Sequence, residues 1–236
     1  MDAAQEHSQH VRQPVVPVQD ALPPLVIESE REVFHEHGGA DFSVMESTAI
    51  VRETGEHLQF HVASVKNGRP GAVCIVEQPD EYGNSVFLIA RHWRVATQQW
   101  AWEFPRGMAK EAETPIRTAI RELAEETGMH VSSSQVTILQ HIHADTGVLR
   151  DDIAVARITV PRSYTEHVEN SDWELASLRW VPATTVQRMI ANGEITDGIT
   201  LAAWSVYCAQ APPQQSLSVC SDMRSSNRHD YYCVVD

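Results

Sequence analysis

The sequence predicts a mixed α/β fold in which helices cover the faces of a mixed β-sheet. Short β-rich runs and three helical patterns follow one another irregularly between residues 43 and 208, which is typical of such a sheet. The chain has 236 residues, 42% of them hydrophobic and six of them Trp, and this is enough for one packed core. A fully disordered or fibrous chain is therefore excluded.

The two ends of the chain differ in composition from the middle. Residues 1–42 are rich in His, Gln, Pro and Glu without sustained periodicity, and residues 209–236 are similarly polar, so we expect a flexible N-terminal arm and a flexible C-terminal tail. Between the arm and the core, two β-rich runs at 44–52 and 57–65 are joined by Thr54-Gly55, which favours a hairpin. Residues 43–66 are therefore expected to form a separate N-terminal β element.

Residues 67–208 are expected to form the main domain. The apolar runs at 72–76 and 86–90 have the composition of central strands buried on both faces. Thr114-Pro115 is a helix-start signal, and Gly128 marks the end of that helix about three and a half turns later. Further patterns complete the domain: strands at 136–142, 153–160 and 175–181, and helices at 183–191 and 198–207.

The charge balance restricts the classes of partner. The chain has 32 Asp and Glu against 18 Lys and Arg, a formal net charge of -14, which argues against binding nucleic acid or an anionic membrane surface. No run of about 18 apolar residues and no basic, apolar leader is present, so we expect a cytoplasmic protein. The four Cys show no CxxC pair and are expected to be free thiols.

One segment has spacing that indicates chemistry, and it reads G-x5-E-x7-R-E-L-x-E-E-x-G-M. Its fixed positions are Gly107, Glu113, Arg121, Glu122, Leu123, Glu125, Glu126, Gly128 and Met129. On a helix, Glu122, Glu125 and Glu126 crowd onto one face, and like charges at this spacing destabilise a helix without a counter-ion. Clustered carboxylates suit Mg²⁺ or Mn²⁺, which leave positions open for water and phosphate oxygens. The segment therefore predicts a metal site.

The neighbouring residues fit the same interpretation. Arg121 can fix one carboxylate through a bidentate bond, and Gly107 lets the backbone come close to an ion and to phosphates. The alternative is a solvated, charged helix face. Seven of these fixed residues, at roughly 7% frequency each and about 200 start positions, would match by chance only about once in 10⁶ chains, which disfavours that alternative.

These residues resemble a complete Nudix box, the signature of Nudix hydrolases. Residues 91–94 and 100–107 resemble the strand and loop that precede the box in the ADP-ribose pyrophosphatase subgroup, and residues 193–207 resemble its closing helix. The hairpin at 44–65 resembles the element through which members of that subgroup dimerise. The resemblance implies a Nudix α/β/α sandwich around a mixed β-sheet with an N-terminal β-hairpin element, and it implies a homodimer.

The resemblance also implies roles in metal binding. Glu122 and Glu126 would ligate the divalent ion directly, Glu125 directly or through water, and Arg106 through its carbonyl oxygen. The ion would be Mg²⁺ or Mn²⁺, which neutralises phosphate charge and lowers the pKa of a bound water.

Further positions take roles around the diphosphate. Glu113 and Arg121 would be a structural pair within the box. Arg94 would bind the diphosphate, and we group Glu103, Arg106 and Gly107 with it as substrate-binding residues.

In the ADP-ribose pyrophosphatases a catalytic base often comes from an acidic loop downstream of the box. The matching stretch here is residues 166–174, where Glu169 is the first candidate and Glu174 the second. An ordinary loop carboxylate is an equally good interpretation of either residue. Glu125 is the candidate within the box itself.

The function implied is a metal-dependent pyrophosphohydrolase that cleaves ADP-ribose or a related nucleoside diphosphate sugar into two monophosphates. The subgroup often carries a proline beyond the box that residues 143–147 lack, so the substrate stays open. The alternatives are a housecleaning nucleoside triphosphate or dinucleotide pyrophosphatase, and a Nudix domain that senses a nucleotide without cleaving it. Sensors tend to lose carboxylates of the box, and this chain keeps all of them.

Overall fold

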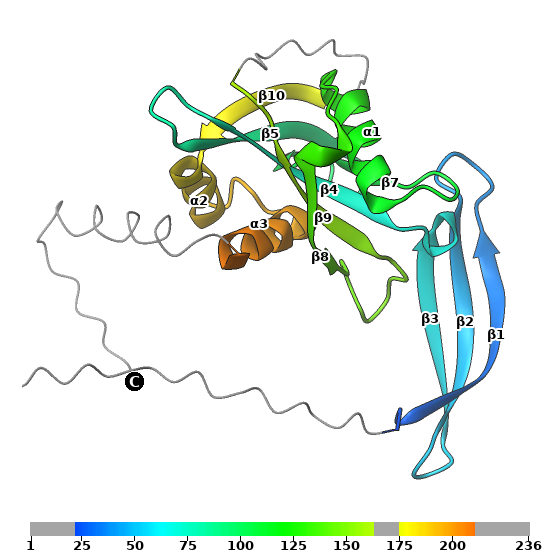
Figure 1. Cartoon of the computed structure of the whole chain (residues 1–236). Coiled ribbons are helices and arrows are strands. Elements are labelled where there is room, and N and C mark those ends of the chain that lie inside the picture. Colours follow the sequence, from blue (N-terminus) through cyan, green and yellow to red (C-terminus); the bar gives the residue numbers. More distant parts are fainter. Residues whose placement is uncertain (1–21, 163–174, 211–236) are drawn as a thin grey trace, which may run out of the picture.

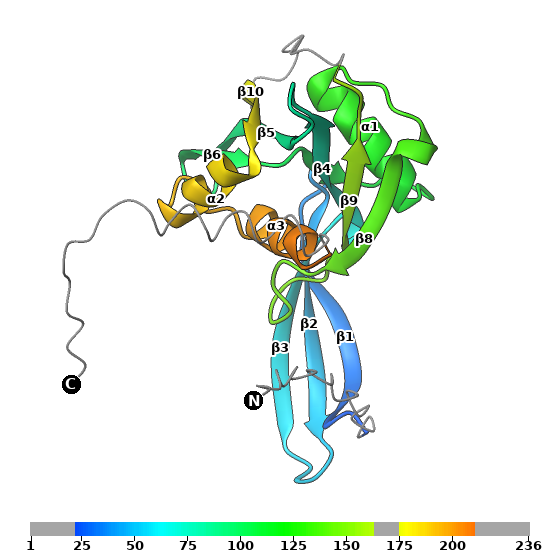
Figure 2. The same cartoon turned by 60° about the vertical axis from the view of Figure 1, so that its left-hand side comes forward.

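The computed structural model describes residues 22–162 and 175–210 (Figure 1). Within these ranges the chain forms a main domain and a three-stranded sheet that extends away from it (Figures 1 and 2). The strands of the extended sheet are β1 (Leu25–His35), β2 (Phe42–Val51) and β3 (His57–Val65), antiparallel in that order. The expected hairpin is thus the pair β2 and β3, and a third strand precedes it.

Strand β1 corrects the expectation that residues 1–42 are a flexible arm. Its backbone pairs with β2 from Leu25 to His35. Nearly every residue of β1 is exposed, so no buried face imposes the alternation by which strands are recognised in sequence. Residues 1–21 and most of the expected tail lie outside the described residues, and α3 ends at Gln210 rather than near residue 208.

The main domain contains a seven-stranded mixed sheet with the order β10-β5-β4-β9-β8, to which β6 and β7 add through β5 and β4. β4 and β9 are parallel, and the other pairs are antiparallel. This is the expected mixed sheet. Its strands are β4 (Gly71–Pro79), β5 (Ser85–Arg94), β6 (Gln99–Glu103), β7 (Arg106–Met108), β8 (Val136–Ile142), β9 (Ile153–Thr159) and β10 (Leu175–Pro182).

Helices cover both faces of this sheet. Helix α1 (Pro115–Thr127) packs on one face, where Ala119 and Leu123 join a cluster with β4, β5 and β9. Helices α2 (Ala183–Ala191) and α3 (Gly198–Gln210) pack on the other face with a second cluster. Two short 3₁₀ turns, Lys66–Gly68 and Ser133–Gln135, complete the helical segments. The three-layer α/β/α arrangement confirms the predicted fold class.

The caps of α1 follow the sequence signals. The side chain of Thr114 accepts a hydrogen bond from the backbone N–H of Arg117, and Pro115 occupies the first helical position. Gly128 ends the helix at φ +70°, which favours a residue without a Cβ. Both ends of the helix are therefore determined locally.

The opening for a site arises where β4 and β5 diverge. The two strands pair only where Glu77, Gln78 and Pro79 lie opposite residues 85–87. Beyond this point β5 pairs with β6 and β4 pairs with β7, so that the segment from β6 to β7 lies between them. The start of the box, at Gly107, is thereby placed between the two central strands and beneath α1.

The extended sheet is attached to the main domain through the loop between β8 and β9. The backbone N–H of Ala63 donates to the carbonyl of Val148, and the N–H of Arg150 donates to the carbonyl of Ala63. The Arg150 guanidinium also contacts Glu30 of β1 at 2.7 Å.

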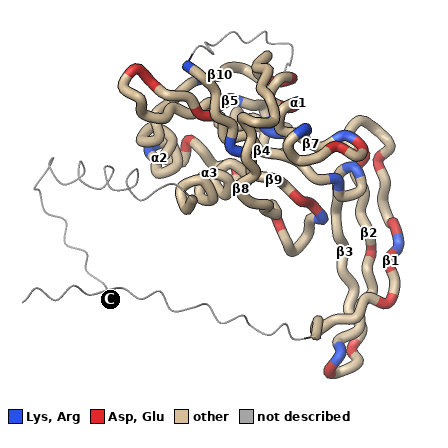
Figure 3. Tube along the Cα trace, in the orientation of Figure 1, with Lys and Arg blue, Asp and Glu red and all other residues tan. Residues whose placement is uncertain are grey.

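Among the described residues, Lys and Arg are interspersed with Asp and Glu and form no continuous stripe (Figure 3). No helix in the described ranges is long and apolar enough to span a bilayer.

Candidate active site

The site is built on β7 and α1. Gly107 in β7 pairs with Ala72 of β4, and the carboxylate of Glu122 lies directly against it. A Cβ at position 107 would come within 2.1 Å of the carboxyl carbon of Glu122. Glycine therefore forms a cradle in which an acidic side chain approaches the backbone, and a larger residue would push Glu122 out.

Arg121 organises the outer side of the carboxylate cluster. Its Nη1 donates to Glu122 Oε1 and to Glu125 Oε2, both at 2.7 Å, and its Nη2 donates to the Met108 carbonyl at 2.8 Å. The same guanidinium contacts Glu113, also at 2.8 Å, and this hydrogen bond lowers the pKa of Glu113 to about 2. One arginine thus partly offsets the repulsion among three carboxylates of the box.

The three carboxylates of the helix face differ in environment. The Glu125 side chain is 52% exposed. Its partial burial raises the pKa of the carboxyl, but the hydrogen bonds from Arg121 and Lys110 outweigh burial and lower the pKa below its ordinary value. Glu122 and Glu126 are turned inward, and burial raises the pKa of both. For Glu126, burial together with the charge of Glu122 raises the pKa to about 8, against the opposing charge of Arg94. A buried, partly protonated carboxylate of this kind needs a cation to ionise fully at neutral pH.

The donor set fits a hard divalent cation. The backbone N–H of Arg106 donates to the Glu126 carboxylate. One oxygen of that carboxylate, Oε2, is buried and accepts no hydrogen bond within the described residues. Carboxylate and carbonyl oxygens are the ligands that Mg²⁺ and Mn²⁺ prefer. No three His, Cys, Asp or Glu side chains converge as they stand in the described ranges, and Glu125 is engaged with Lys110 and Arg121. Glu122 and Glu126 are therefore the inward pair that would hold the ion.

Two arginines lie beside the carboxylates and share one buried acid. Glu103 is 1% exposed and accepts from Arg94 Nε at 2.8 Å, Arg94 Nη2 at 2.5 Å and Arg106 Nε at 2.9 Å. Burial opposes ionisation of Glu103, but the hydrogen bond and charge of Arg94 and the charge of Arg106 lower its pKa. Glu103 therefore holds two cationic groups next to the site, where they can bind phosphate oxygens.

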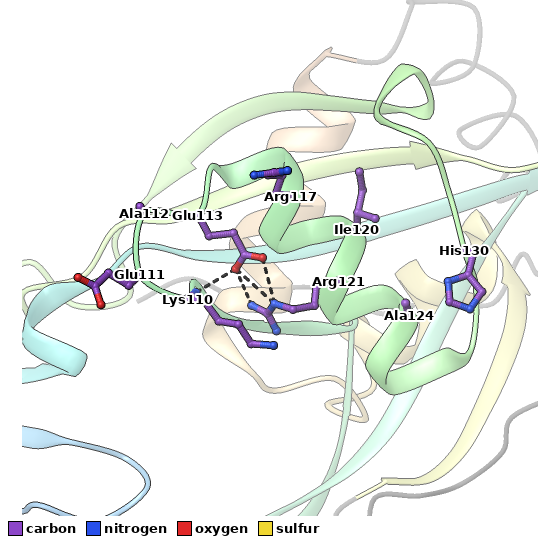
Figure 4. A pocket seen from close by; sticks show the side chains of 9 residues that line it. All are labelled: Lys110, Glu111, Ala112, Glu113, Arg117, Ile120, Arg121, Ala124 and His130. Carbon is purple, nitrogen blue, oxygen red and sulfur yellow. Dashed lines mark hydrogen bonds and ion pairs between the residues drawn. The ribbon is translucent and has the colours of Figure 1, made fainter.

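A surface cavity of about 560 Å³ lies on the outer side of this arrangement, and Figure 4 shows its lining. In that view Glu113 points toward Arg121, with Lys110 beside them. The cavity does not include Glu122 or Glu126. It therefore lies behind the carboxylate pair and does not form part of the candidate active site. It is lined by Lys110, Glu111, Ala112, Glu113, Arg117, Ile120, Arg121, Ala124 and His130.

Residues 68–202 match the NUDIX domain family. The chain belongs to the Nudix hydrolase family. An ADP-ribose pyrophosphatase of Mycobacterium tuberculosis (strain ATCC 25618 / H37Rv) is 29% identical over 157 residues, which cover 65% of this chain and 66% of that protein. The chain thus spans about two thirds of that relative's length.

Two further proteins are similar to this Nudix chain. A CMP-5'-(N-acetyl-N-hydroxy-3-aminopropyl)phosphonate hydrolase of Streptomyces rubellomurinus (strain ATCC 31215) is 36% identical over 173 residues, covering 68% of this chain and 73% of that protein. The solved structure of an ADP compounds hydrolase matches with a TM-score of 0.62 at 15% identity, covering 86% of this chain and 98% of that one. The structural match supports the Nudix fold.

The structure brings together most of the residues that the Nudix resemblance assigned to the metal and to the diphosphate, but Glu125 is turned toward Lys110 and Arg121. Glu122 and Glu126 lie on the inner face of α1, and Arg94, Glu103 and Arg106 form one connected group beside them. The candidate bases Glu169 and Glu174 lie outside the described residues. Their roles stay predictions.

Two residues near the site were not assigned a role from the sequence. Asp197 accepts from Arg106 Nη2 at 3.4 Å and also caps α3 through the backbone N–H of Thr200. His92 is buried on β5 beside Glu126. His92 lies within residues 91–94 and Asp197 directly precedes the helical pattern at 198–207, but neither position indicated a place in the site, because both reach it through tertiary packing.

Proposed function

We propose that this Nudix chain is a divalent-metal-dependent pyrophosphohydrolase that cleaves the diphosphate of ADP-ribose, or of a related nucleoside diphosphate sugar, into two monophosphates. The observation that carries the proposal is the inward pair Glu122 and Glu126, of which Glu122 lies against Gly107, with two arginines held beside the pair by Glu103. Nudix hydrolases generally use divalent metals, and the Mg²⁺ assignment rests on the oxygen-only donor set.

In this proposal, one group of residues would hold the metal ion and another would bind the diphosphate. Glu122, Glu126 and the carbonyl of Arg106 would hold the ion, with Glu125 reaching it directly or through water. Once bound, such an ion supplies charge neutralisation at the phosphates and a lower pKa for water. Arg94 and Arg106, fixed by Glu103, would hold the diphosphate oxygens and so orient the linkage for in-line attack.

Similarity to an ADP-ribose pyrophosphatase and to an ADP compounds hydrolase supports an adenosine diphosphate substrate. A second candidate is a cytidine monophosphate group joined to a phosphonate, because a relative named as a hydrolase of such a compound is 36% identical over 68% of this chain. Nucleoside triphosphates, dinucleotides and binding without cleavage are the remaining alternatives. The location in the cytoplasm stays a prediction from the sequence.

A substrate panel tests the proposal. Purified protein with Mg²⁺ is offered ADP-ribose, other nucleoside diphosphate sugars, a CMP-linked phosphonate and dinucleotides, and alkaline phosphatase then releases phosphate only from linkages that were cut. Nucleoside triphosphates are followed by ion-exchange chromatography, because the phosphatase attacks them directly. We expect the highest kcat/KM on ADP-ribose. Binding of ADP-ribose with no cleavage of any compound would indicate a sensor and overturn the proposal.

We also propose that the chain is a homodimer formed through the extended sheet. Strands β1 to β3 have no second layer within the described residues, and a three-stranded sheet needs a packed face for stability. Large apolar side chains are exposed on it, among them Ile27 at 56%, Phe34 at 52% and Phe60 at 39%. Ile27 and Phe60 lie on one face of the sheet, because they align with Ala49 and Ser47 of β2, whereas Phe34 aligns with Val44 on the other face. Large apolar side chains exposed on an uncovered sheet favour an interface there.

Light scattering checks the dimer. The wild type is expected to have twice the mass of one chain at micromolar concentration, and Ile27→Glu is expected to shift it toward the monomer because a charge enters the apolar face that Ile27 shares with Phe60. Tyr82→Glu is the matched control, since Tyr82 is 81% exposed in the β4–β5 turn of the main domain. A fully active wild-type monomer would contradict the proposal.

A further inference from the structure

Glu122 and Glu126 project from α1, and one buried side chain of the sheet, His92, faces this pair from β5. His92 lies on β5 with its side chain 3% exposed, and its Nε2 is 3.8 Å from Oε2 of Glu126. A small side-chain rotation would bring the two atoms to hydrogen-bonding distance. Glu126, a residue of α1, is thus contacted by the backbone of β7 and faced by His92 of β5.

The register of β5 explains why His92 faces this way. Side chains alternate between the faces of a strand, and Leu88 and Ala90 belong to the cluster beneath α1. His92, two residues further, continues on that face. The neighbouring Arg91 is exposed and pairs with Trp102 of β6, on the opposite face.

Two carboxylates interact with the His92 ring, Glu126 at 3.8 Å and Glu103 through its charge, and they differ in how many more hydrogen bonds they can accept. Both oxygens of Glu103 already accept from Arg94, and one also accepts from Arg106. Oε2 of Glu126 is buried and accepts no hydrogen bond from the described part of the chain. Glu126 is therefore the carboxylate that a donor on His92 would satisfy.

We propose that His92 is a positioning residue, whose Nε2–H donates to the Glu126 carboxylate and holds it in the orientation that ligates the metal. Carboxylate ligands are oriented by hydrogen bonds from outer residues, and loss of such a partner typically weakens metal affinity by about 10- to 100-fold. The inference deepens the proposed function, because it assumes that Glu126 is a metal ligand.

Binding of Mn²⁺ alone, measured by calorimetry and by electron paramagnetic resonance of the free ion, tests the inference. His92→Leu keeps a similar volume without a donor and is expected to bind Mn²⁺ about 10- to 100-fold more weakly. His92→Gln restores an N–H donor and is expected to recover most of that loss. The control is Gln78→Leu, which removes a buried polar side chain at the far end of β4. It is expected to leave Mn²⁺ affinity unchanged.

The outcomes separate this inference from the proposed function. Wild-type affinity in His92→Leu overturns the positioning role, as does equal weakening in His92→Gln and His92→Leu. Failure of wild-type protein to bind Mn²⁺ or to cleave any substrate would instead contradict the proposed function. If His92→Leu does not fold, nitrogen-15 spectra of wild-type imidazoles decide, because a His92 ring without a proton on Nε2 overturns the proposal.

Discussion

Glu126→Gln is expected to lower kcat by orders of magnitude while the fold stays intact. The amide keeps the volume of the buried side chain but removes the negative charge that a divalent cation needs. Steady-state kinetics on the best substrate of the panel measure the loss, and circular dichroism verifies the fold. The wild type is expected to be inactive in EDTA and to recover when Mg²⁺ is added.

The matched control is Glu111→Gln, which makes the same chemical change at an exposed position outside the carboxylate pair. Its kcat is expected to stay within a few-fold of the wild type. Near-normal turnover in Glu126→Gln would refute the assignment of this carboxylate to the metal.

Glu126→Gln is expected to lower kcat but to raise the stability of the metal-free protein at high pH. The pKa of Glu126 rises from its ordinary value of 4.5 to about 8 on folding, so the folded state favours the protonated carboxyl. The resulting stabilisation is complete below pH 4.5 and is lost as the pH rises through 8. In EDTA at pH 8.5, Glu126→Gln is therefore expected to melt at a higher temperature than the wild type, and the difference should shrink toward pH 5. An unchanged difference across this range would contradict the burial argument.

Local signals were sufficient to predict helix α1. The ends of α1 are set by contacts between residues close together in the sequence, at Thr114, Pro115 and Gly128. Both ends could therefore be located from the sequence. The crowding of Glu122, Glu125 and Glu126 on one face also follows from helical spacing alone. The orientation of these carboxylates does not follow, because it depends on Arg121 reaching back to Glu113 and the Met108 carbonyl.

The features that the sequence did not reveal depend on tertiary contacts or on missing burial. β1 lacks a buried face, and so it has no hydrophobic alternation. The divergence of β4 and β5 results from competing pairings with β6 and β7, and no local pattern records such a competition. His92 and Asp197 reach the site only because β5 and α3 pack around it. A site of this kind is therefore predictable in the helix that carries its carboxylates and unpredictable in its surroundings.

The last expected result concerns the base that activates the attacking water. If Glu169 orients or deprotonates that water, Glu169→Gln should lower kcat far more than it changes KM, because the interaction forms mainly in the transition state. General-base catalysis typically contributes about 10²- to 10⁴-fold, which sets the size of the loss. Glu174→Gln is the paired variant, since it makes the same change five residues along the same acidic stretch.

The pair of kcat values at saturating Mg²⁺ and substrate distinguishes the candidates. A large loss in Glu169→Gln alone assigns the base to that residue, and the reverse pattern assigns it to Glu174. If neither value falls by tenfold, residues 166–174 do not supply the base. Glu125 then becomes the better candidate, because it is the half-exposed carboxylate of the box and its lowered pKa keeps it ionised at neutral pH. A carboxylate that is ionised and reachable from solvent can accept a proton, whereas the buried Glu122 and Glu126 would be occupied in holding the ion.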